Sequence, residues 1–486
     1  MAATTVVTAM TALAIVAQDH VPLRAGPDST TVHAQLWQGE LLEVRSNQQG
    51  QLQVYDHRLE RAGYVRASEA RIVGTSEADA PQLLSVLQFL RDAPGSESLG
   101  IAYAAAYLKA APASSITAEP FDALGVMAER LARGATLKQG KADVISAHMD
   151  VATQYGVKFL SYAGSAGAGQ RDAVQLCYDG DAYRHVLAMD GAAGKPKANA
   201  DQRARAVLAL TRHDCIDPTL SPAARKTSDQ QRAGLLDSID VSEKAQLDET
   251  LRKRLHVRRA GVWAAVAFGK SRFQEAPQPA AQRAVDELAA VDKAGLSGED
   301  RADYVEAAIR VGAVRWAAAS PTATVDRLQI QLAPNEPGQT CVRLVDGWAK
   351  TPTTLGQRCT FGTVWPASVK ASPEGRALAL VVQPLEGWSE LWVWHQEPDG
   401  WKVDVATPAT SGPGLGYVEW AGWSPAARGK LLVVRQSKAE GRVSRRFEVL
   451  RLDTLVAEKS ASDPRQLAAF NLWADVGWRQ ESVSLR

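Results

Sequence analysis

The apolar residues of this 486-residue chain change their spacing twice, and this change constrains the fold more than any other feature. Over residues 19–73, short alternating runs are divided by turn residues, which predicts short strands. Over about 78–320, apolar residues recur at helical spacing, and from about 325 onward strand patterns return. Hydrophobic cores usually stop growing near about 250 residues. We therefore predict a multidomain α+β protein with three folded regions.

Residues 1–18 precede the first strand pattern and are weakly apolar, without Lys or Arg before Arg24. A secretory signal normally has a basic start and small residues at both cleavage positions, whereas a cut after Ala17 would put Ile15 at the outer position. Two alternatives stay open for this segment, a truncated or uncleaved export signal and an N-terminal tail. No later stretch reaches the roughly 18 to 20 uninterrupted apolar residues of a membrane span, so we predict a chain that does not cross a membrane.

Three short motifs lie in the first region: LRAGP at 23–27, QGELLEV at 38–44 and GYV at 63–65. They resemble the L-R-x-G-P turn, the K-G-x-x-x-x-V strand and the closing G-W-V of bacterial SH3 domains, with Tyr64 in place of the usual Trp. The resemblance implies that residues 19–75 form a small SH3-like β-barrel that is used for binding.

The ligand of this first region is expected at its aromatic side chains. Trp37, Tyr55 and Tyr64 are the candidate ligand-binding residues, because aromatic rings give a large contact area at little entropic cost. The resemblance implies a protein partner or peptidoglycan as the ligand.

The second region, residues 78–320, is predicted to be α-helical. Leu83, Leu87 and Leu90 fall on one helical face, and Ser297 begins a capping box ahead of another amphipathic run. Successive helices joined by short loops indicate an α-helical solenoid or an irregular bundle.

The third region, residues 325–486, is β-rich and contains 10 of the 13 tryptophans. A Ser-Pro turn followed by an apolar run occurs at 372–382 and again, 52 residues later, at 424–434. This repeat resembles the S-P-D-G strand motif of TolB-like β-propellers. Blades need roughly 40 to 50 residues, so the region holds three or four at most. We predict a Trp-rich β domain, either a partial propeller or a sandwich of two small sheets.

The tryptophans of the third region have two interpretations. They could form a platform for a carbohydrate or a peptide, but Trp at strand positions is more often core. The segment from Tyr417 to Leu452 also resembles the tails of uncharacterised SH3 domain-containing proteins of Gram-negative bacteria, and that resemblance implies no activity.

The charge of the chain argues against nucleic acid as a partner. Lys and Arg total 55 against 54 Asp and Glu, so the net charge is +1 and no overall positive field exists. The densest basic run, residues 252–259, follows Asp248 and Glu249, and we interpret it as a solvated helix face.

No catalytic or metal-binding motif is recognisable. Ser165 lacks the Gly two residues earlier that a nucleophile elbow needs, and Cys215 closes a helical run instead of opening a helix as a thiolate nucleophile does. The sequence has neither H-E-x-x-H nor C-x-x-C. We predict no catalytic residue, no metal and no cofactor.

The four cysteines allow three pairings. Pairing within regions joins Cys177 to Cys215 and Cys341 to Cys359. Two local disulfides are what an oxidising compartment produces, so they favour a periplasmic or otherwise exported protein. The alternative is four buried thiols in a cytoplasmic protein.

Together these features favour a non-catalytic interaction or scaffold protein of the cell envelope that binds cell wall or a protein partner through its SH3-like and β domains. Two alternatives stay open. One is a divergent cell-wall hydrolase, and the other is a cytoplasmic scaffold.

Overall fold

The computed structural model describes residues 12–163, 174–189, 198–319, 327–349, 353–409, 414–425, 429–439 and 442–480. They form a mixed α+β protein whose sheets are predominantly antiparallel. The chain divides into two compact units. The described residues of unit 1 run to Ala163, then from Val174 to Ile216 and from Ile239 to Leu247, and unit 2 holds the rest of the described chain. The predicted helical region 78–320 is thus divided between both units.

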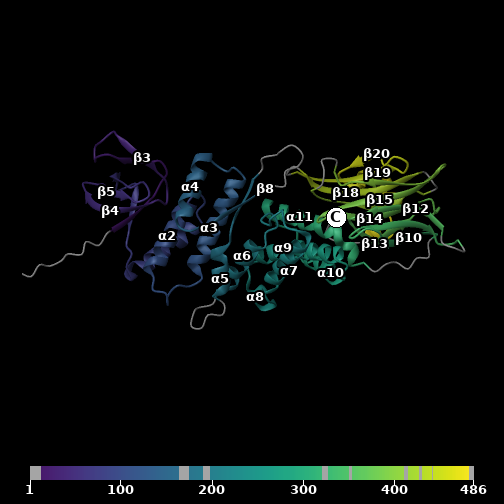
Figure 1. Ribbon diagram of the computed structural model, residues 1–486, viewed down its shortest axis with the longest axis horizontal. Coiled ribbons are helices and arrows are strands. Elements are labelled where there is room, and N and C mark those ends of the chain that lie inside the picture. Colours follow the sequence, from purple (N-terminus) through teal and green to yellow (C-terminus); the bar gives the residue numbers. More distant parts are fainter. Residues whose placement is uncertain are drawn as a thin grey trace, which may run out of the picture. The chain divides into compact units, whose positions relative to one another are not determined.

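Unit 1 begins with a seven-stranded antiparallel sheet in the order β3-β2-β6-β5-β4-β1-β7 (Figure 1). All seven strands contribute to one apolar core, so the sheet curves around its own interior. Within residues 12–73, all of which are described, β3 and β7 are edge strands and the sheet does not close into a barrel. Its strands are β1 (Ala12–Val16), β2 (Val21–Arg24), β3 (Val32–Leu36), β4 (Leu41–Gln48), β5 (Gln51–Asp56), β6 (Arg61–Arg66) and β7 (Ala70–Val73).

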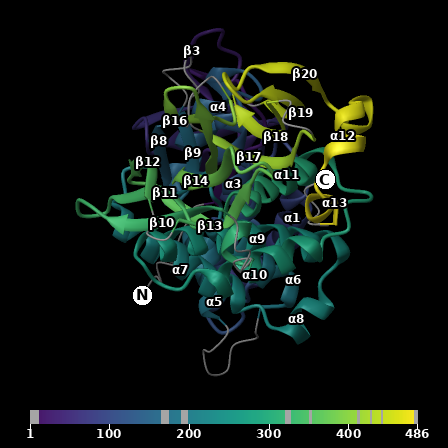
Figure 2. The same cartoon turned by 90° about the vertical axis from the view of Figure 1, so that its right-hand side faces the viewer.

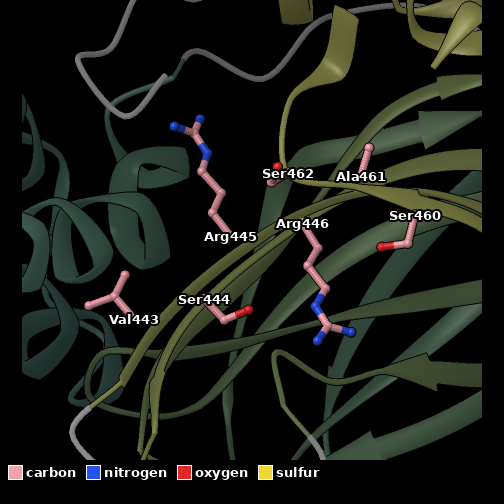
Figure 3. A pocket seen from close by; sticks show the side chains of 7 residues that line it. All are labelled: Val443, Ser444, Arg445, Arg446, Ser460, Ala461 and Ser462. Atoms are coloured by element: carbon pink, nitrogen blue, oxygen red, sulfur yellow. The ribbon is translucent and has the colours of Figure 1, made fainter. Parts of the chain in front are cut away.

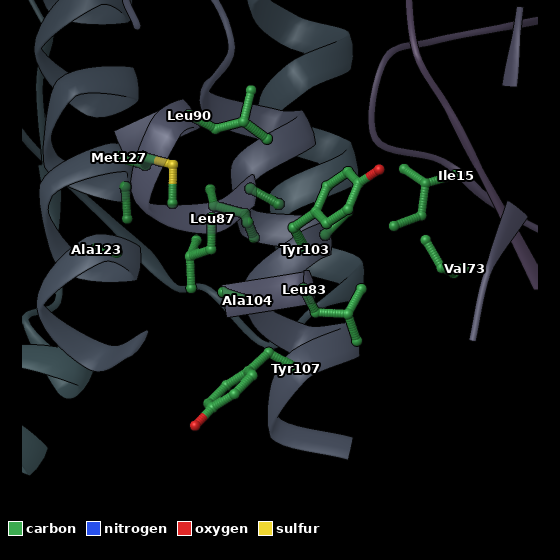
Figure 4. Packing of buried hydrophobic residues seen from close by; sticks show 14 of the residues in the cluster. Ile15, Val73, Leu83, Leu87, Leu90, Tyr103, Ala104, Tyr107, Ala123 and Met127 are labelled. Atoms are coloured by element: carbon green, nitrogen blue, oxygen red, sulfur yellow. The ribbon is translucent and has the colours of Figure 1, made fainter. Parts of the chain in front are cut away.

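Strand β1 lies between β4 and β7 and is buried on both faces. Ala14 and Val16 belong to the core of the sheet, whereas Ile15 packs with Val73 against the helices of unit 1 (Figure 4). A run that is apolar at every position is what a strand covered on both faces requires. Residues 12–16, assigned from sequence to an export signal or a tail, are therefore a structural strand, and a cut after Ala17 would remove it.

The first four α-helices of unit 1 share an apolar core with the sheet. A two-stranded hairpin, β8 (Phe159–Ala163) with β9 (Val174–Tyr178), interrupts the helices of unit 1 where sequence analysis expects only helices. Its strands are rich in aromatic and β-branched residues, which favour extended structure. The helical elements are η1 (Glu77–Asp79), α1 (Ala80–Arg91), α2 (Glu97–Ala110), α3 (Glu119–Thr136), α4 (Ala142–Gln154), α5 (Asp181–Ala188), α6 (Ala200–Leu210) and α8 (Val241–Gln246).

Unit 2 begins with helices, of which α9 carries the basic run. In this run Arg254 pairs with Asp300 at 2.6 Å, and His256 pairs with Glu287 at 2.6 Å. Arg259 is 4% exposed. The prediction of a solvated face is therefore wrong for much of the run, because it packs against neighbouring helices. The helices are α7 (Pro222–Asp237), α9 (Glu249–Arg272), α10 (Gln278–Ala289), α11 (Gly298–Val314) and η2 (Arg315–Ala317).

The β part of unit 2 consists of a three-stranded and an eight-stranded sheet (Figure 2). The smaller sheet contains β10 (Leu328–Pro334), β11 (Thr340–Asp346) and β12 (Thr353–Thr360). The larger contains β13 (Thr363–Ala371), β14 (Ala377–Leu385), β15 (Trp388–Glu397), β16 (Gly400–Ala406), β17 (Leu415–Trp423), β18 (Lys430–Ala439), β19 (Arg442–Arg451) and β20 (Ala457–Ala461). The chain ends, after η3 (Pro464–Gln466), with α12 (Ala468–Trp473) and α13 (Val476–Gln480).

The larger sheet is built from two antiparallel four-stranded meanders, β13–β16 and β17–β20, joined by a short parallel pairing of β15 with β17. The sequence repeat occupies equivalent places in both meanders, because β14 and β18 are each the second strand of their meander. The Ser372 N–H donates to the Ala377 carbonyl, and the Ser424 N–H donates to the Lys430 carbonyl. The 52-residue offset is therefore a structural repeat of one meander.

The central strands β14, β15 and β17 of the larger sheet are buried at nearly every position and so are covered on both faces. One apolar cluster joins the smaller sheet to β14 and β15, and another packs α12 and α13 onto β17–β19. Most of the tryptophans in this part of the chain are core residues, whereas Trp348 is 69% exposed. The buried ones are Trp365, Trp388, Trp392, Trp394, Trp420 and Trp478.

Two disulfides are present, Cys177–Cys215 in unit 1 and Cys341–Cys359 in unit 2. They are the pairs that sequence analysis favours. Cys341 and Cys359 are direct cross-strand partners on β11 and β12. Cys177 lies on β9 and ties the hairpin to the loop after α6.

Candidate binding surface

The outer face of β4, β5 and β6 is the candidate binding surface. Along β5 the burial alternates: Leu52 and Val54 are fully buried, whereas Tyr55 is half-buried. On β6, Tyr64 is half-buried beside the buried Val65. This alternation is typical of a sheet with one face packed and the other open to solvent.

The strand register brings two of the three predicted aromatic residues together. Tyr55 lies opposite Ala62, and Tyr64 lies opposite Gln53. The two tyrosines are therefore diagonal neighbours on one face, a spacing that aromatic side chains can bridge.

Tyr55 has polar neighbours on β4 and just beyond the end of β5. The Arg45 guanidinium lies 4.6 Å from the ring centroid, and the His57 ring meets Tyr55 edge-on at 4.9 Å. Glu43 links these neighbours, since its carboxylate lies 2.6 Å from His57 Nε2 and 3.3 Å from Arg45 Nε. Tyr64 has no aromatic, cation–π or side-chain hydrogen-bond contact within the described residues, so its ring is the more available of the two.

Trp37 does not belong to this pair. It follows β3 and packs its ring against His20, with the centroids 4.5 Å apart. The next residue, Gln38, donates its backbone N–H to Asp19 Oδ1 at 3.2 Å. The structure thus separates Trp37 from the tyrosine face and places it beside the contact between the sheet and the helices.

The loops after β1 and β3 are joined by polar contacts to α2, to α4 and to the residue that follows α4. His148 Nε2 lies 2.7 Å from Asp19 Oδ1, and the Tyr155 hydroxyl donates to the Gly39 carbonyl at 2.7 Å. Gly39 has a φ of 91°, and a Cβ there would lie 2.6 Å from the Ser98 carbonyl oxygen. This close approach requires glycine. The partners are up to 129 residues apart, so no local pattern signals them.

Glu40 sits in this contact and is 3% exposed. Burial raises its pKa from 4.5 to about 7, although the Arg58 guanidinium, 2.8 Å from Oε1, acts in the opposite direction. Asp56, also 3% exposed, adds a second carboxylate near Arg58. The contact between sheet and helices therefore contains a carboxyl group that titrates near neutral pH.

The structure also bears on the catalytic candidates. Cys215 is bonded to Cys177, so its sulfur is not a thiolate nucleophile in this state. Ser165 lies outside the described residues. Among the residues that the structure describes, no group of three or more His, Cys, Asp or Glu is arranged to hold a metal ion.

Within the same residues, none of the helices combines the length and the apolarity needed to cross a membrane. Comparison with known proteins gave no matching family model, curated protein or solved structure. The functional argument therefore depends on the geometry of the chain itself.

Proposed function

We propose that this protein is a non-catalytic interaction protein of the cell envelope, and that it binds a protein partner through the outer face of an SH3-like N-terminal sheet. The observation that carries this proposal is the placement of Tyr55 and Tyr64 side by side on the outer face of a sheet whose apolar contact with the helices is made at β1 and β7. Tyrosine and arginine are enriched where proteins bind one another, and Arg45 lies beside Tyr55.

Two further observations support the proposal. The disulfides fit an oxidising compartment, which favours export over a cytoplasmic scaffold. The disulfide at Cys215 argues against a cysteine hydrolase. Purified protein is therefore expected to release no muropeptides from peptidoglycan, and release that Cys215→Ser abolishes would contradict the proposal.

A binding assay tests the surface directly. Protein cross-linked in intact cells and isolated under denaturing conditions is expected to carry partner proteins, identified by mass spectrometry. Tyr55→Ala with Tyr64→Ala should remove those partners. Phe89→Ala is the matched control, because Phe89 on α1 is also aromatic and is 75% exposed.

Peptidoglycan is the other outcome of this experiment. Cosedimentation with purified sacculi that depends on Tyr55 and Tyr64 would assign the surface to cell wall instead of a protein. Unchanged partners in the double variant, with thermal midpoints equal to the parent, would contradict the proposed surface.

A further inference from the structure

The outer edge of β19 is only partly covered. β19 pairs with β18 along its whole length, Arg442–Arg451, but β20 pairs only with Phe447 to Leu450. Among the described residues, no strand lies beside the remaining edge from Arg442 to Arg446. An uncovered edge offers backbone donors and acceptors to another chain.

The direction of these backbone groups follows from the hydrogen bonds at the far end of β19. The Leu452 N–H donates to the Gly429 carbonyl on the β18 side, at 2.8 Å, and the Arg451 N–H donates at 3.0 Å to the turn before β20. Directions alternate along an antiparallel strand, and the β18–β19 register has no shift. Val443 and Arg445 therefore point their N–H and C=O groups toward the uncovered edge.

A shallow hollow of about 620 Å³ lies at this edge, at the point where β20 ends (Figure 3). Figure 3 shows the Arg445 and Arg446 side chains pointing to opposite sides of β19. The hollow is lined by Val443, Ser444, Arg445, Arg446, Ser460, Ala461 and Ser462. Hydroxyl and guanidinium groups thus surround the backbone edge on both faces.

The hollow carries positive charge without a matching acid. Arg445 Nε and Nη2 are shielded from solvent and have no hydrogen-bond partner. Burial and then the charge of Arg445 lower the pKa of Lys293, so a second cation is near. Glu448, on the same strand, is already paired with Arg435 at 2.7 Å. Within the described residues, no acidic side chain lies within ion-pair distance of Arg445 or Arg446.

We propose that the uncovered edge of β19 binds an extended acidic peptide segment of a protein partner by strand addition. The segment would run antiparallel to β19, continuing the line of β20 and hydrogen bonding to Val443 and Arg445. Its carboxylates would pair with Arg445 on one face and Arg446 on the other. Main-chain hydrogen bonds give such complexes affinity, and side chains give them specificity. This site lies in unit 2 and does not depend on the tyrosine surface.

Charged residues at a strand edge have a simpler role, which is to prevent association with other strands. That role predicts a basic edge that repels basic strands and has no saturable affinity for an acidic one. The unpaired guanidinium nitrogens of Arg445 and the hollow beside them favour binding. The two roles are separated by measuring affinity directly.

The probe is a fluorescein-labelled hexapeptide, Thr-Val-Asp-Glu-Val-Thr, whose adjacent acidic side chains point to opposite faces of an extended strand. It is compared with Thr-Val-Lys-Arg-Val-Thr, which has the same extended preference and the opposite charge. Fluorescence polarisation with the full chain is expected to show saturable binding of the acidic peptide only. Arg445→Ser with Arg446→Ser should weaken it by about tenfold or more. Arg301→Ser, at an exposed arginine on α11, is the matched charge control and should leave it unchanged.

A backbone test distinguishes strand addition from simple charge attraction. Val443→Pro removes an N–H that points to the uncovered edge and leaves the β18 pairing intact, so it should abolish binding, whereas Val443→Ala should retain it. Hydrogen exchange should slow at Val443 and Arg445 when the acidic peptide is bound. No saturable binding up to about 1 mM, equal binding of both peptides, or full binding by a folded Val443→Pro variant would overturn the proposal.

Discussion

The N-terminal sheet of unit 1 and the C-terminal sheets of unit 2 both carry aromatic residues on antiparallel strands, yet they use them differently. On β5 and β6, Tyr55 and Tyr64 stand on an open face and are half-buried. On β15, Trp388, Trp392 and Trp394 are all buried. The difference lies in what covers the strands, because β14, β15 and β17 at the centre of the larger sheet are covered on both faces.

The sequence shows this difference in the spacing of apolar residues along each strand. β5 reads QLQVYD and buries every second residue, whereas β14 reads ALALVVQPL and buries seven in succession. Alternation indicates a face in contact with solvent, and a continuous apolar run indicates a strand covered twice. An aromatic residue is therefore a candidate contact in the first setting and a core residue in the second.

The largest expected effect is at Trp394, which is 1% exposed and packs across to Gly356 on β12. Trp394→Ala should lower the free energy of unfolding of unit 2 by about 3 to 5 kcal/mol in urea titrations. Trp348→Ala, at a 69% exposed tryptophan, should change it by about 0.5 kcal/mol or less. Tyr64→Ala should lower the free energy of unfolding of unit 1 by about 1 kcal/mol or less. Similar losses at both tryptophans would contradict the two-sided core.

The next effect concerns the disulfides, one in each unit. Cys177–Cys215 closes a separation of 38 residues and Cys341–Cys359 one of 18. In the chain-entropy model, closing these loops stabilises the folded state by about 4 and about 3 kcal/mol, respectively. Paired Cys→Ser variants, followed by thermal unfolding, should therefore destabilise unit 1 more than unit 2. A larger loss in unit 2 would show that the cross-strand bond matters through β11–β12 packing instead of loop closure.

A smaller, pH-dependent effect is expected at Glu40. In the folded protein its pKa is about 7, above the ordinary value of 4.5. Between pH 4.5 and about pH 7 the folded protein therefore keeps a proton that the unfolded chain has lost. Stability should therefore fall as pH rises from about 4.5 to about 7, by at most about 3 kcal/mol. Glu40→Gln should remove that dependence in urea titrations near pH 5 and pH 8. Glu60→Gln, at an exposed residue, should keep it, and a parent with a flat profile would contradict the assignment.

Sequence patterns anticipated some features of this protein and missed others for identifiable reasons. The Ser372 and Ser424 turns and the cysteine pairs depend on local or regional spacing, which a sequence displays directly. Strand β1 was missed because a run buried on both faces has the composition of an export signal. The contact between Asp19 and His148 joins residues 129 apart, and only the folded chain reveals it.

The proposed binding surface was only partly predictable. Alternation on β5 and β6 identifies Tyr55 and Tyr64 as outward residues. It does not show that Tyr55 is flanked by Arg45 and His57, which depends on the register of β4 with β5. Trp37 lies beyond the end of β3, where alternation carries no information about its direction.

The central claim is that the tyrosine face contacts a partner in the cell. The most direct measurement replaces Tyr64 with the photocrosslinker p-benzoylphenylalanine in the native host and compares it with the same replacement at Phe89, which is more exposed. Light should produce a discrete, higher-mass protein adduct at position 64 and none at position 89. Absence of an adduct at 64 in a folded, correctly localised protein, or identical adducts at both positions, would contradict the account.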